Sequence, residues 1–209
     1  MNHPSSQSLE PEEFKAEPFQ VLQPFQAALK EWAVAVDALI AAETVVLLRK
    51  GGIREAGFKV DNRPFWLYPT YEHQKPELLK PNYANLVTTV SPGWHPGLVS
   101  IGAWAMITHQ CELTEQVQLD RLMPHHIWNK DFTEMRLKWK PNLALTVVFL
   151  RVFRLNKSVE IPFESVYGGC RSWTTLQPKI DASDSVAVLS DDRYAQKVRE
   201  ILSLMDARD

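Results

Sequence analysis

The chain has 209 residues and a formal net charge of -2, from 23 Lys and Arg against 25 Asp and Glu. Hydrophobic residues make up 45% of it, including 7 Trp, which excludes a disordered chain or a coiled coil and suits a domain with its own core. The chain has no apolar stretch of membrane-spanning length and no signal-peptide pattern at its start, so we expect a cytoplasmic protein without membrane contact.

The charge is unevenly distributed along the chain. Residues 1–20 carry one Lys and four Glu, and residues 181–209 carry four bases and seven acids, so each end has a charge of -3. The segment between them has 18 bases and 14 acids, which gives +4. We predict a disordered acidic tail over residues 1–19 and one domain over residues 20–209. The basic body favours an anionic partner, DNA or RNA, although such charges also serve solubility alone.

The first half of the domain predicts a helix followed by strands. A helix over residues 24–42 is expected from apolar side chains at steps of three and four, which are Phe25, Leu29, Trp32, Val36 and Leu39. The apolar, partly β-branched run at residues 44–49 predicts a buried strand. Strands are also expected at residues 65–70 and 86–90, with a polar loop that has room for one helical turn over residues 71–85.

The second half predicts an alternating strand over residues 97–109, a short helix over residues 114–123 and strands over residues 143–155 and 159–161. A terminal helix is expected over residues 191–205, with Ser190 as its N-cap. Strands and helices do not alternate regularly. The sequence therefore predicts the α+β class, with a mostly antiparallel sheet or a small β-barrel flanked by helices.

Two segments at predicted strand ends carry candidate site residues. Around Gly51 and Gly52, the cations Arg49, Lys50 and Arg54 suit phosphate binding, and the alternative is a basic turn in water. After residue 70 the chain reads Tyr71-Glu72-His73-Gln74-Lys75. There a tyrosine can stack on a base, the histidine or the amide can read a base edge, and the lysine can contact phosphate.

Glu72 and His73 also suit an acid/base pair in catalysis. The alternative is that this segment is a polar connector in which the two side chains only form local hydrogen bonds. A third segment places Arg136, Lys138 and Trp139 together, which is typical of a nucleic-acid surface. Its alternative is that Trp139 belongs to the core.

Cysteine and histidine give weaker indications. The turn Tyr167-Gly-Gly-Cys-Arg-Ser-Trp173 presents Cys170, which a neighbouring base would make nucleophilic, but a structural cysteine fits the residues better. The other cysteine, Cys111, is distant, so no disulfide framework is expected. Adjacent residues such as His125 and His126 point in different directions and make a poor chelating pair. We expect no metal and no cofactor.

The strings Leu47-Leu-Arg-Lys-Gly-Gly-Ile53, Tyr68-Pro-Thr-Tyr-Glu-His-Gln-Lys-Pro76 and Tyr167-Gly-Gly-Cys-Arg-Ser-Trp173 resemble an uncharacterised bacterial family, domain of unknown function 1802. The resemblance covers residues 24–177. It implies no established activity, but some members occur beside restriction-endonuclease domains, which implies a link to restriction–modification. The opening helix and strand also resemble ASCH domains of the PUA-like superfamily, which implies a small β-barrel tied to RNA or modified bases.

The sequence thus predicts a non-catalytic nucleic-acid-binding module with contacts from Arg49, Lys50, Arg54, Tyr71, His73, Gln74, Lys75, Arg136, Lys138 and Trp139. One alternative is a hydrolase or nuclease that uses Glu72 and His73. The other is a protein-interaction subunit that binds a partner through its acidic tail or its terminal helix.

Overall fold

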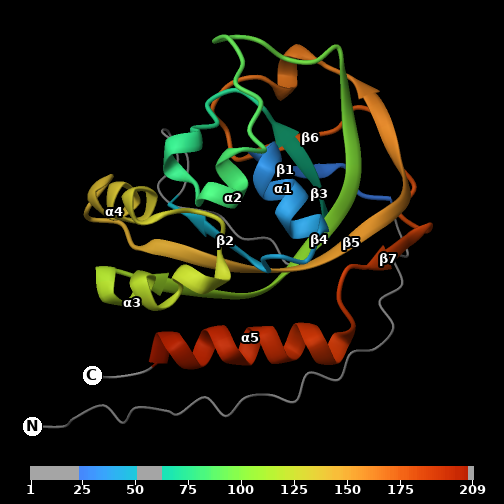
Figure 1. Ribbon diagram of the computed structural model, residues 1–209. Coiled ribbons are helices and arrows are strands. Elements are labelled where there is room, and N and C mark those ends of the chain that lie inside the picture. Colours follow the sequence, from blue (N-terminus) through green and yellow to red (C-terminus); the bar gives the residue numbers. More distant parts are fainter. Residues whose placement is uncertain (1–23, 51–62, 207–209) are drawn as a thin grey trace, which may run out of the picture.

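The computed structural model describes residues 24–50 and 63–206 (Figure 1). The predicted tail over residues 1–19 and the position of Arg54 lie outside these described residues. Short 3₁₀ helices are labelled η. The elements in chain order are β1 (Ala27–Trp32), α1 (Ala33–Ile40), β2 (Val46–Arg49), β3 (Phe65–Thr70), η1 (Pro76–Leu78), α2 (Pro81–Ala84), β4 (Leu98–Leu113), α3 (Gln116–Arg121), η2 (Met123–His125), α4 (Lys130–Lys138), β5 (Leu145–Pro162), η3 (Ser165–Tyr167), β6 (Trp173–Thr175), β7 (Ser185–Ala187) and α5 (Asp191–Asp206).

The described strands form one curved, mixed sheet in the order β2-β5-β4-β3-β1-β6, and β7 pairs with β5. Strands β1 and β3 are parallel, and the other described pairs are antiparallel. The long β4–β5 ribbon has register shifts between Ile101 and Ala103 and between Ile107 and His109. Such bulges bend a strand and increase its twist. The sheet curls around α1, while α5 lies outside it (Figure 1). The predicted α+β class and mostly antiparallel sheet are confirmed.

The sheet buries apolar side chains on both of its faces. Successive residues of a strand point to opposite faces, and β3 follows this rule. Phe65 and Leu67 join the core cluster that contains α1, whereas Trp66 and Tyr68 join a second cluster with residues of β4 and β5. This double burial explains why the sequence of β3 is nearly all apolar.

The predicted helix over residues 24–42 is wrong in its first part, because Ala27–Trp32 is a strand and only Ala33–Ile40 is helical. The strand lies between β3 and β6, and Ala28 and Leu29 are both fully buried on opposite faces. Pairing with two neighbours therefore overrides the helical spacing of the apolar residues.

Other boundaries also differ from the predictions. The predicted strand over residues 86–90 is absent from the described structure, where these residues are largely exposed and no strand pairs with them. The two strands predicted over residues 143–155 and 159–161 are one strand, β5, because β4 pairs with it along most of its length. Helix α4 and strands β6 and β7 were not predicted. Strand β2 and helix α5 agree with their predictions.

Helix α5 docks its apolar face on its own domain. Tyr194, Val198, Ile201 and Met205 are buried, and the Arg151 guanidinium on β5 bonds the Asp191 carboxylate at 2.6 Å. This face is therefore occupied within the chain rather than offered to a partner. None of the described helices has the length and apolarity needed to cross a bilayer.

Candidate nucleic-acid interface

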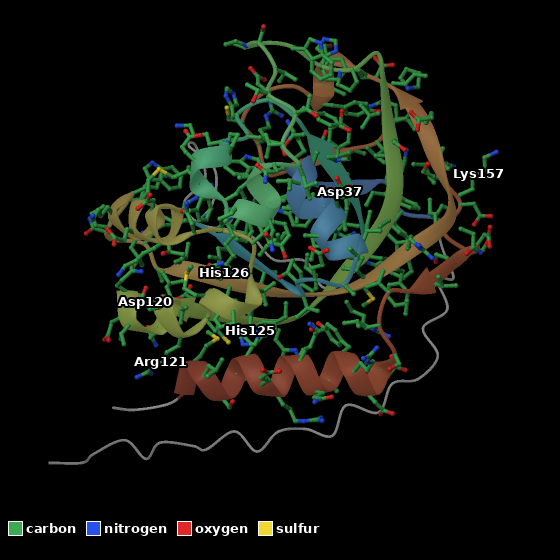
Figure 2. The ribbon with its side chains drawn as sticks, viewed as in Figure 1. Asp37, Asp120, Arg121, His125, His126 and Lys157 are labelled. Atoms are coloured by element: carbon green, nitrogen blue, oxygen red, sulfur yellow. The ribbon has the colours of Figure 1, made fainter. Side chains whose placement is uncertain are left out.

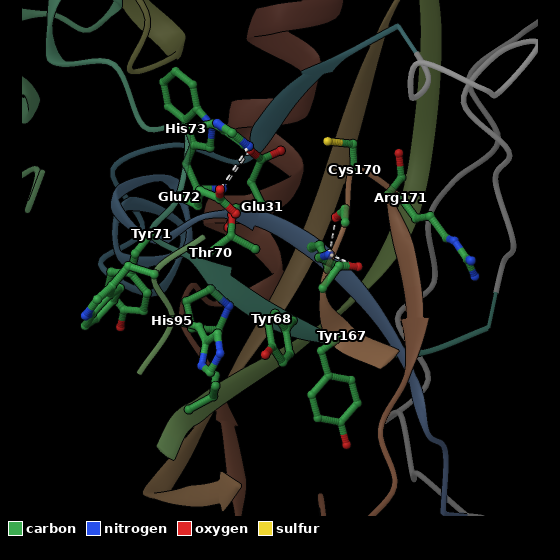
Figure 3. Close-up of a pocket in the computed structure, with 18 of the residues that line it drawn as sticks. Glu31, Tyr68, Thr70, Tyr71, Glu72, His73, His95, Tyr167, Cys170 and Arg171 are labelled. Atoms are coloured by element: carbon green, nitrogen blue, oxygen red, sulfur yellow. Dashed lines mark hydrogen bonds and ion pairs between the residues drawn. The ribbon is translucent and has the colours of Figure 1, made fainter. Parts of the chain in front are cut away.

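A cavity of about 560 Å³ opens where the carboxyl ends of β1, β2 and β3 come together. Its remaining walls are the loop before β4, the end of α4 and the turn after η3. In the close-up, Glu72 and His73 lie on one side of the cavity and Cys170 and Arg171 on the other, with Tyr68 between them (Figure 3). Segments far apart in the sequence thus assemble one concave site.

The cavity is positively charged. Among the described residues, five cationic side chains and two carboxylates line it, so this lining carries +3 with histidines neutral. The cations are Lys30, Arg49, Lys50, Arg136 and Arg171, and the carboxylates are Glu31 and Glu72. A cleft lined mainly by one sign of charge concentrates ligands of the opposite sign. The arrangement therefore favours an anion.

Arg49 is held in place by Glu31. Its Nη1 atom donates to Glu31 Oε2 at 2.6 Å, and the two side chains are 14% and 8% exposed. The Thr70 hydroxyl donates to the backbone carbonyl of Glu31 at 2.9 Å, which joins β3 to β1 beside this pair. A carboxylate this close offsets part of the arginine charge, so Arg49 contributes less to the potential than an unpaired cation would.

Lys50 connects β2 to α4. Its Nζ donates to the carbonyls of Arg136 at 3.0 Å and Leu137 at 2.8 Å. These carbonyls belong to the last turn of the helix, where a cation is favourable. Burial, with a contribution from the nearby Arg136, lowers the pKa of Lys50. The ammonium therefore adds positive charge to the cavity while its donors serve the protein.

The same helix end supplies a cation and an aromatic ring to the wall. The Arg136 guanidinium lies 5.1 Å from the Phe132 ring centroid and 5.6 Å from that of Trp139. Contacts of this kind between a guanidinium and an aromatic face are attractive. They hold Arg136 and Trp139 of the third sequence segment next to each other at the cavity, whereas Lys138 of that segment is not among its lining residues.

Lys30 is bound by the glycine turn that follows η3. Its Nζ donates to the carbonyl of Gly168 at 3.3 Å and to that of Gly169 at 2.6 Å. Gly169 has a φ of +75°, which a residue without Cβ adopts readily. Burial lowers the pKa of Lys30, and the neighbouring Arg171 acts in the same direction. The two glycines thus shape the cavity wall, next to the exposed Cys170.

Glu72 and His73 are in contact, as the acid/base hypothesis requires. Glu72 Oε1 accepts a hydrogen bond from the Gly93 N–H at 2.7 Å and lies 3.6 Å from His73 Nε2 (Figure 3). His73 has a φ of +67°, a strained conformation for a residue with a side chain. The pair lies at the rim, with side chains 36% and 64% exposed.

Aromatic rings line the rim and the interior. Tyr71 and Trp94 meet edge to face, with centroids 5.9 Å apart, and Trp94 is 45% exposed. His95 stacks on Phe163 at 3.5 Å. Exposed rings next to cationic groups are the combination that binds the bases and phosphates of single strands.

The structure brings together most of the residues predicted from the sequence. Those that line the cavity are Arg49, Lys50, Tyr71, Glu72, His73, Arg136 and Trp139. Lys75 and Lys138 are exposed and outside the lining, and Lys138 pairs with Glu134 at 3.2 Å. Gln74 is buried and accepts a hydrogen bond from the Val34 N–H at 3.1 Å. Its amide therefore stabilises the start of α1 rather than facing a base.

Sequence reasoning missed Lys30, Glu31 and Trp94. The predicted helix over residues 24–42 covers the first two, whereas a strand at these positions ends at the sheet edge that holds the site. The loop around Trp94 had no motif to single it out. Arg171 also lines the cavity and lies in the same glycine turn as Cys170.

The adjacent histidines lie away from this cavity. His125 is next to α5 (Figure 2), with its Nε2 3.9 Å from Glu200 Oε1. Burial, reinforced by the nearby Lys80, lowers the pKa of His126 to about 3. Within the described ranges, no three His, Cys, Asp or Glu side chains gather where they could hold a metal ion.

With this fold and site, the chain belongs to the family described as a domain of unknown function, DUF1802, whose family model matches residues 28–200. The resemblance predicted from the sequence is confirmed. No curated protein matches the chain at a significant level.

Among solved structures, the chain is similar to ASCH proteins from Zymomonas mobilis. The crystal structure of a serine-to-alanine mutant of ZmASCH has 11% identity and a TM-score of 0.45, with 86% of this chain and 99% of that chain covered. The crystal structure of ASCH from the same organism has 12% identity and a TM-score of 0.42, with 83% and 93% covered. At this level of similarity, no function is transferred from those proteins.

Proposed function

We propose that this protein is a nucleic-acid-binding module that holds an unpaired nucleotide of DNA or RNA in the cavity. The observation that carries the proposal is the convergence of a lining charge of +3 with exposed aromatic rings in one site of about 560 Å³. Small-molecule sites span roughly 300–1,000 Å³, so the cavity has room for one nucleotide but is too confined for a duplex.

The two kinds of lining suit the two parts of a nucleotide. The guanidinium of Arg136 and the neighbouring ammonium groups attract the phosphate, whose contacts dominate affinity and make it sensitive to salt. The rings of Tyr71 and Trp94 at the rim offer faces and edges to the base. Stacking of this kind tolerates every base, so we expect weak sequence preference.

Fluorescence anisotropy with labelled ten-nucleotide single strands of RNA and DNA tests the proposal. We expect binding that weakens steeply between 50 and 200 mM salt. The Trp94→Ala variant should weaken binding by roughly tenfold, since a stacked base contributes about 1–3 kcal/mol. Because Trp94 is already 45% exposed, its removal should leave the urea midpoint nearly unchanged.

A matched pair on α4 provides the charge control. Arg136→Gln removes a cation from the cavity wall, and Lys138→Gln removes one from the same helix outside the cavity. Only Arg136→Gln should weaken binding and make the affinity less dependent on salt. Arg136→Lys keeps the positive charge and should retain most of the affinity. Equal effects of the two glutamine variants, or no retention of any strand at 50 mM salt, would refute the proposal.

A hydrolase is a second candidate, favoured by the 3.6 Å contact between Glu72 and His73 at the rim. If these groups act as acid and base, the protein should cleave a single strand with Mg²⁺ or Mn²⁺, and Glu72→Gln should abolish cleavage without weakening binding. Cleavage that survives Glu72→Gln and His73→Asn would exclude the pair.

The links to restriction–modification and to a partner protein remain predictions. The apolar face of α5 is covered by the rest of the domain, so the predicted partner-binding segments are residues 1–19 and the exposed polar face of α5. Undiminished capture of a partner by a chain lacking residues 1–19 would rule that segment out.

A further inference from the structure

A second depression of about 190 Å³ lies next to the cavity and shares three lining residues with it. Both are lined by Lys30, Gly168 and Arg171, so these residues form the ridge between them. Beyond the ridge, the depression runs along β6, the last strand of the described sheet. Its further lining consists of Val166, Trp173, Thr174, Thr175 and Gln177.

The ridge presents positive charge to both sides. Figure 3 shows the Arg171 side chain extending away from Tyr68 and His95, and no described residue forms a hydrogen bond or ion pair with its exposed guanidinium. Lys30 is fixed beside it by the carbonyls of Gly168 and Gly169.

The depression is polar and lacks opposing charge. Its described lining contains the two ridge cations and no carboxylate, together with two threonine hydroxyls and the Gln177 amide. Cations attract a phosphate, and hydroxyl and amide groups form hydrogen bonds with phosphate, sugar or base. A free mononucleotide in the cavity would leave this second set of groups unused.

We propose that the ligand is a single-stranded polynucleotide of at least two nucleotides, with one base in the cavity, the linking phosphate over Lys30 and Arg171, and the next nucleotide in the second depression. This inference rests on the proposed function. Beyond the proposed function, it excludes a free mononucleotide as the preferred ligand and gives the strand a path across the surface.

A length series tests the path. Uridine 5′-monophosphate and the 5′-phosphorylated di- and tetrauridylates are titrated against the full chain by quenching of tryptophan fluorescence, because Trp32, Trp94 and Trp139 line the cavity. The dinucleotide should bind at least roughly fivefold more tightly than the mononucleotide, since it adds a phosphate contact and a second base.

Two substitutions of one exposed residue separate the depression from the cavity. Thr175 lies on β6 and lines the second depression but not the cavity. Thr175→Glu places a carboxylate there and should remove the gain in affinity between mononucleotide and dinucleotide. The affinity for the mononucleotide should stay within about twofold of that of the unaltered protein. Thr175→Lys keeps a similar length with the opposite charge and should preserve or increase the gain. Arg171→Ala should reduce it.

The outcomes distinguish the two proposals. Equal affinities for mono-, di- and tetranucleotide would overturn the path while leaving nucleotide binding in the cavity intact. A length gain that Thr175→Glu does not change would also overturn it, because the second nucleotide would then lie elsewhere. Failure of every member of the series to bind would overturn both proposals.

Discussion

Three buried tyrosines allow a test of how a buried hydroxyl affects stability with and without a hydrogen-bond partner. Tyr68, Tyr167 and Tyr194 are 3%, 1% and 3% exposed. The Tyr68 hydroxyl has no hydrogen-bond partner among the described residues. The Tyr167 hydroxyl accepts from the Gln177 N–H at 2.8 Å, and that of Tyr194 lies 2.5 Å from Thr108 Oγ1. The same change to phenylalanine should therefore have opposite effects.

The expected magnitude for Tyr68→Phe follows from the desolvation of its hydroxyl. Burial is the largest of the causes that raise the pKa of Tyr68, so the group stays neutral and its cost is that of an unpaired polar group. An unpaired buried polar group lowers the free energy of unfolding by about 1–3 kcal/mol. Removing the oxygen recovers this amount, less about 0.3 kcal/mol for the void that it leaves. The variant should raise the free energy of unfolding by about 1 kcal/mol.

The partnered tyrosines should respond in the other direction. Tyr194→Phe removes a hydrogen bond and should cost about 1 kcal/mol, and Tyr167→Phe leaves the Gln177 N–H unpaired and should cost about 1–2 kcal/mol. Urea titration and thermal melting of the three variants provide the measurement. For a chain of this length, 1 kcal/mol shifts Tm by about 2–4 °C.

A loss of stability in Tyr68→Phe as large as in the two partnered variants would refute the reasoning. It would mean that the hydroxyl is satisfied, for example by an ordered water that bridges it to another polar group. Unchanged ring packing can be checked at the same time, because Tyr68 and Tyr167 have centroids 5.4 Å apart and near-UV dichroism reports their surroundings.

Three further changes follow from contacts described above. Burial lowers the pKa of His126 to about 3, whereas the pKa of this histidine in the unfolded chain is near 6.5. As the pH falls, the unfolded chain therefore binds the proton first. The free energy of unfolding, measured by urea titration, should fall by up to about 2 kcal/mol between pH 6.5 and 5. Lys50→Met removes two hydrogen bonds to α4 carbonyls and should cost about 2 kcal/mol in the same assay. Glu31→Gln breaks the 2.6 Å pair with Arg49, which should lower the free energy of unfolding by about 3 kcal/mol and raise single-strand affinity at low salt, measured by anisotropy.

Each of these has an opposing result, and the first and third also have a matched control. His73→Asn removes an exposed histidine and should leave the acid-dependent loss intact. Burial also lowers the pKa values of His109 and His125, so His126→Gln should reduce the loss without abolishing it, and an undiminished loss would exclude His126 as a source. An unchanged urea midpoint in Lys50→Met would show that α4 is held by other contacts. Glu134→Gln, which alters a carboxylate outside the cavity, should leave single-strand affinity unchanged, and an effect equal to that of Glu31→Gln would indicate general charge attraction.

Local pattern predicted the elements that local forces control. Helix α5 has acidic residues in its first turn and a buried apolar face, and these features agree with one another. Strand β1 has residues that favour a helix, and nothing within Ala27–Trp32 reveals that β3 and β6 pair with it on both sides. Its conformation depends on partners far away in the chain, which single-sequence periodicity does not detect.

The same distinction applies to the site. Residue types indicated that Arg49, Glu72, His73 and Arg136 could work together, and the cavity gathers all four. Residue types could not show that the amide of Gln74 stabilises the start of α1, or that the ammonium of Lys50 is bound to helix carbonyls. Whether a polar group faces a ligand or the protein depends on its tertiary contacts.

The cavity draws its walls from segments that run from Lys30 to Ser172, so no short fragment can form it. A ligand that occupies it binds only the folded chain and leaves the unfolded chain untouched. Mass action then stabilises the fold by about 2.7 kcal/mol when the free ligand is at a hundred times its Kd. Heat denaturation in the presence of a library of nucleotides and oligonucleotides would thus report occupancy of the site directly, before any chemistry is assigned to it.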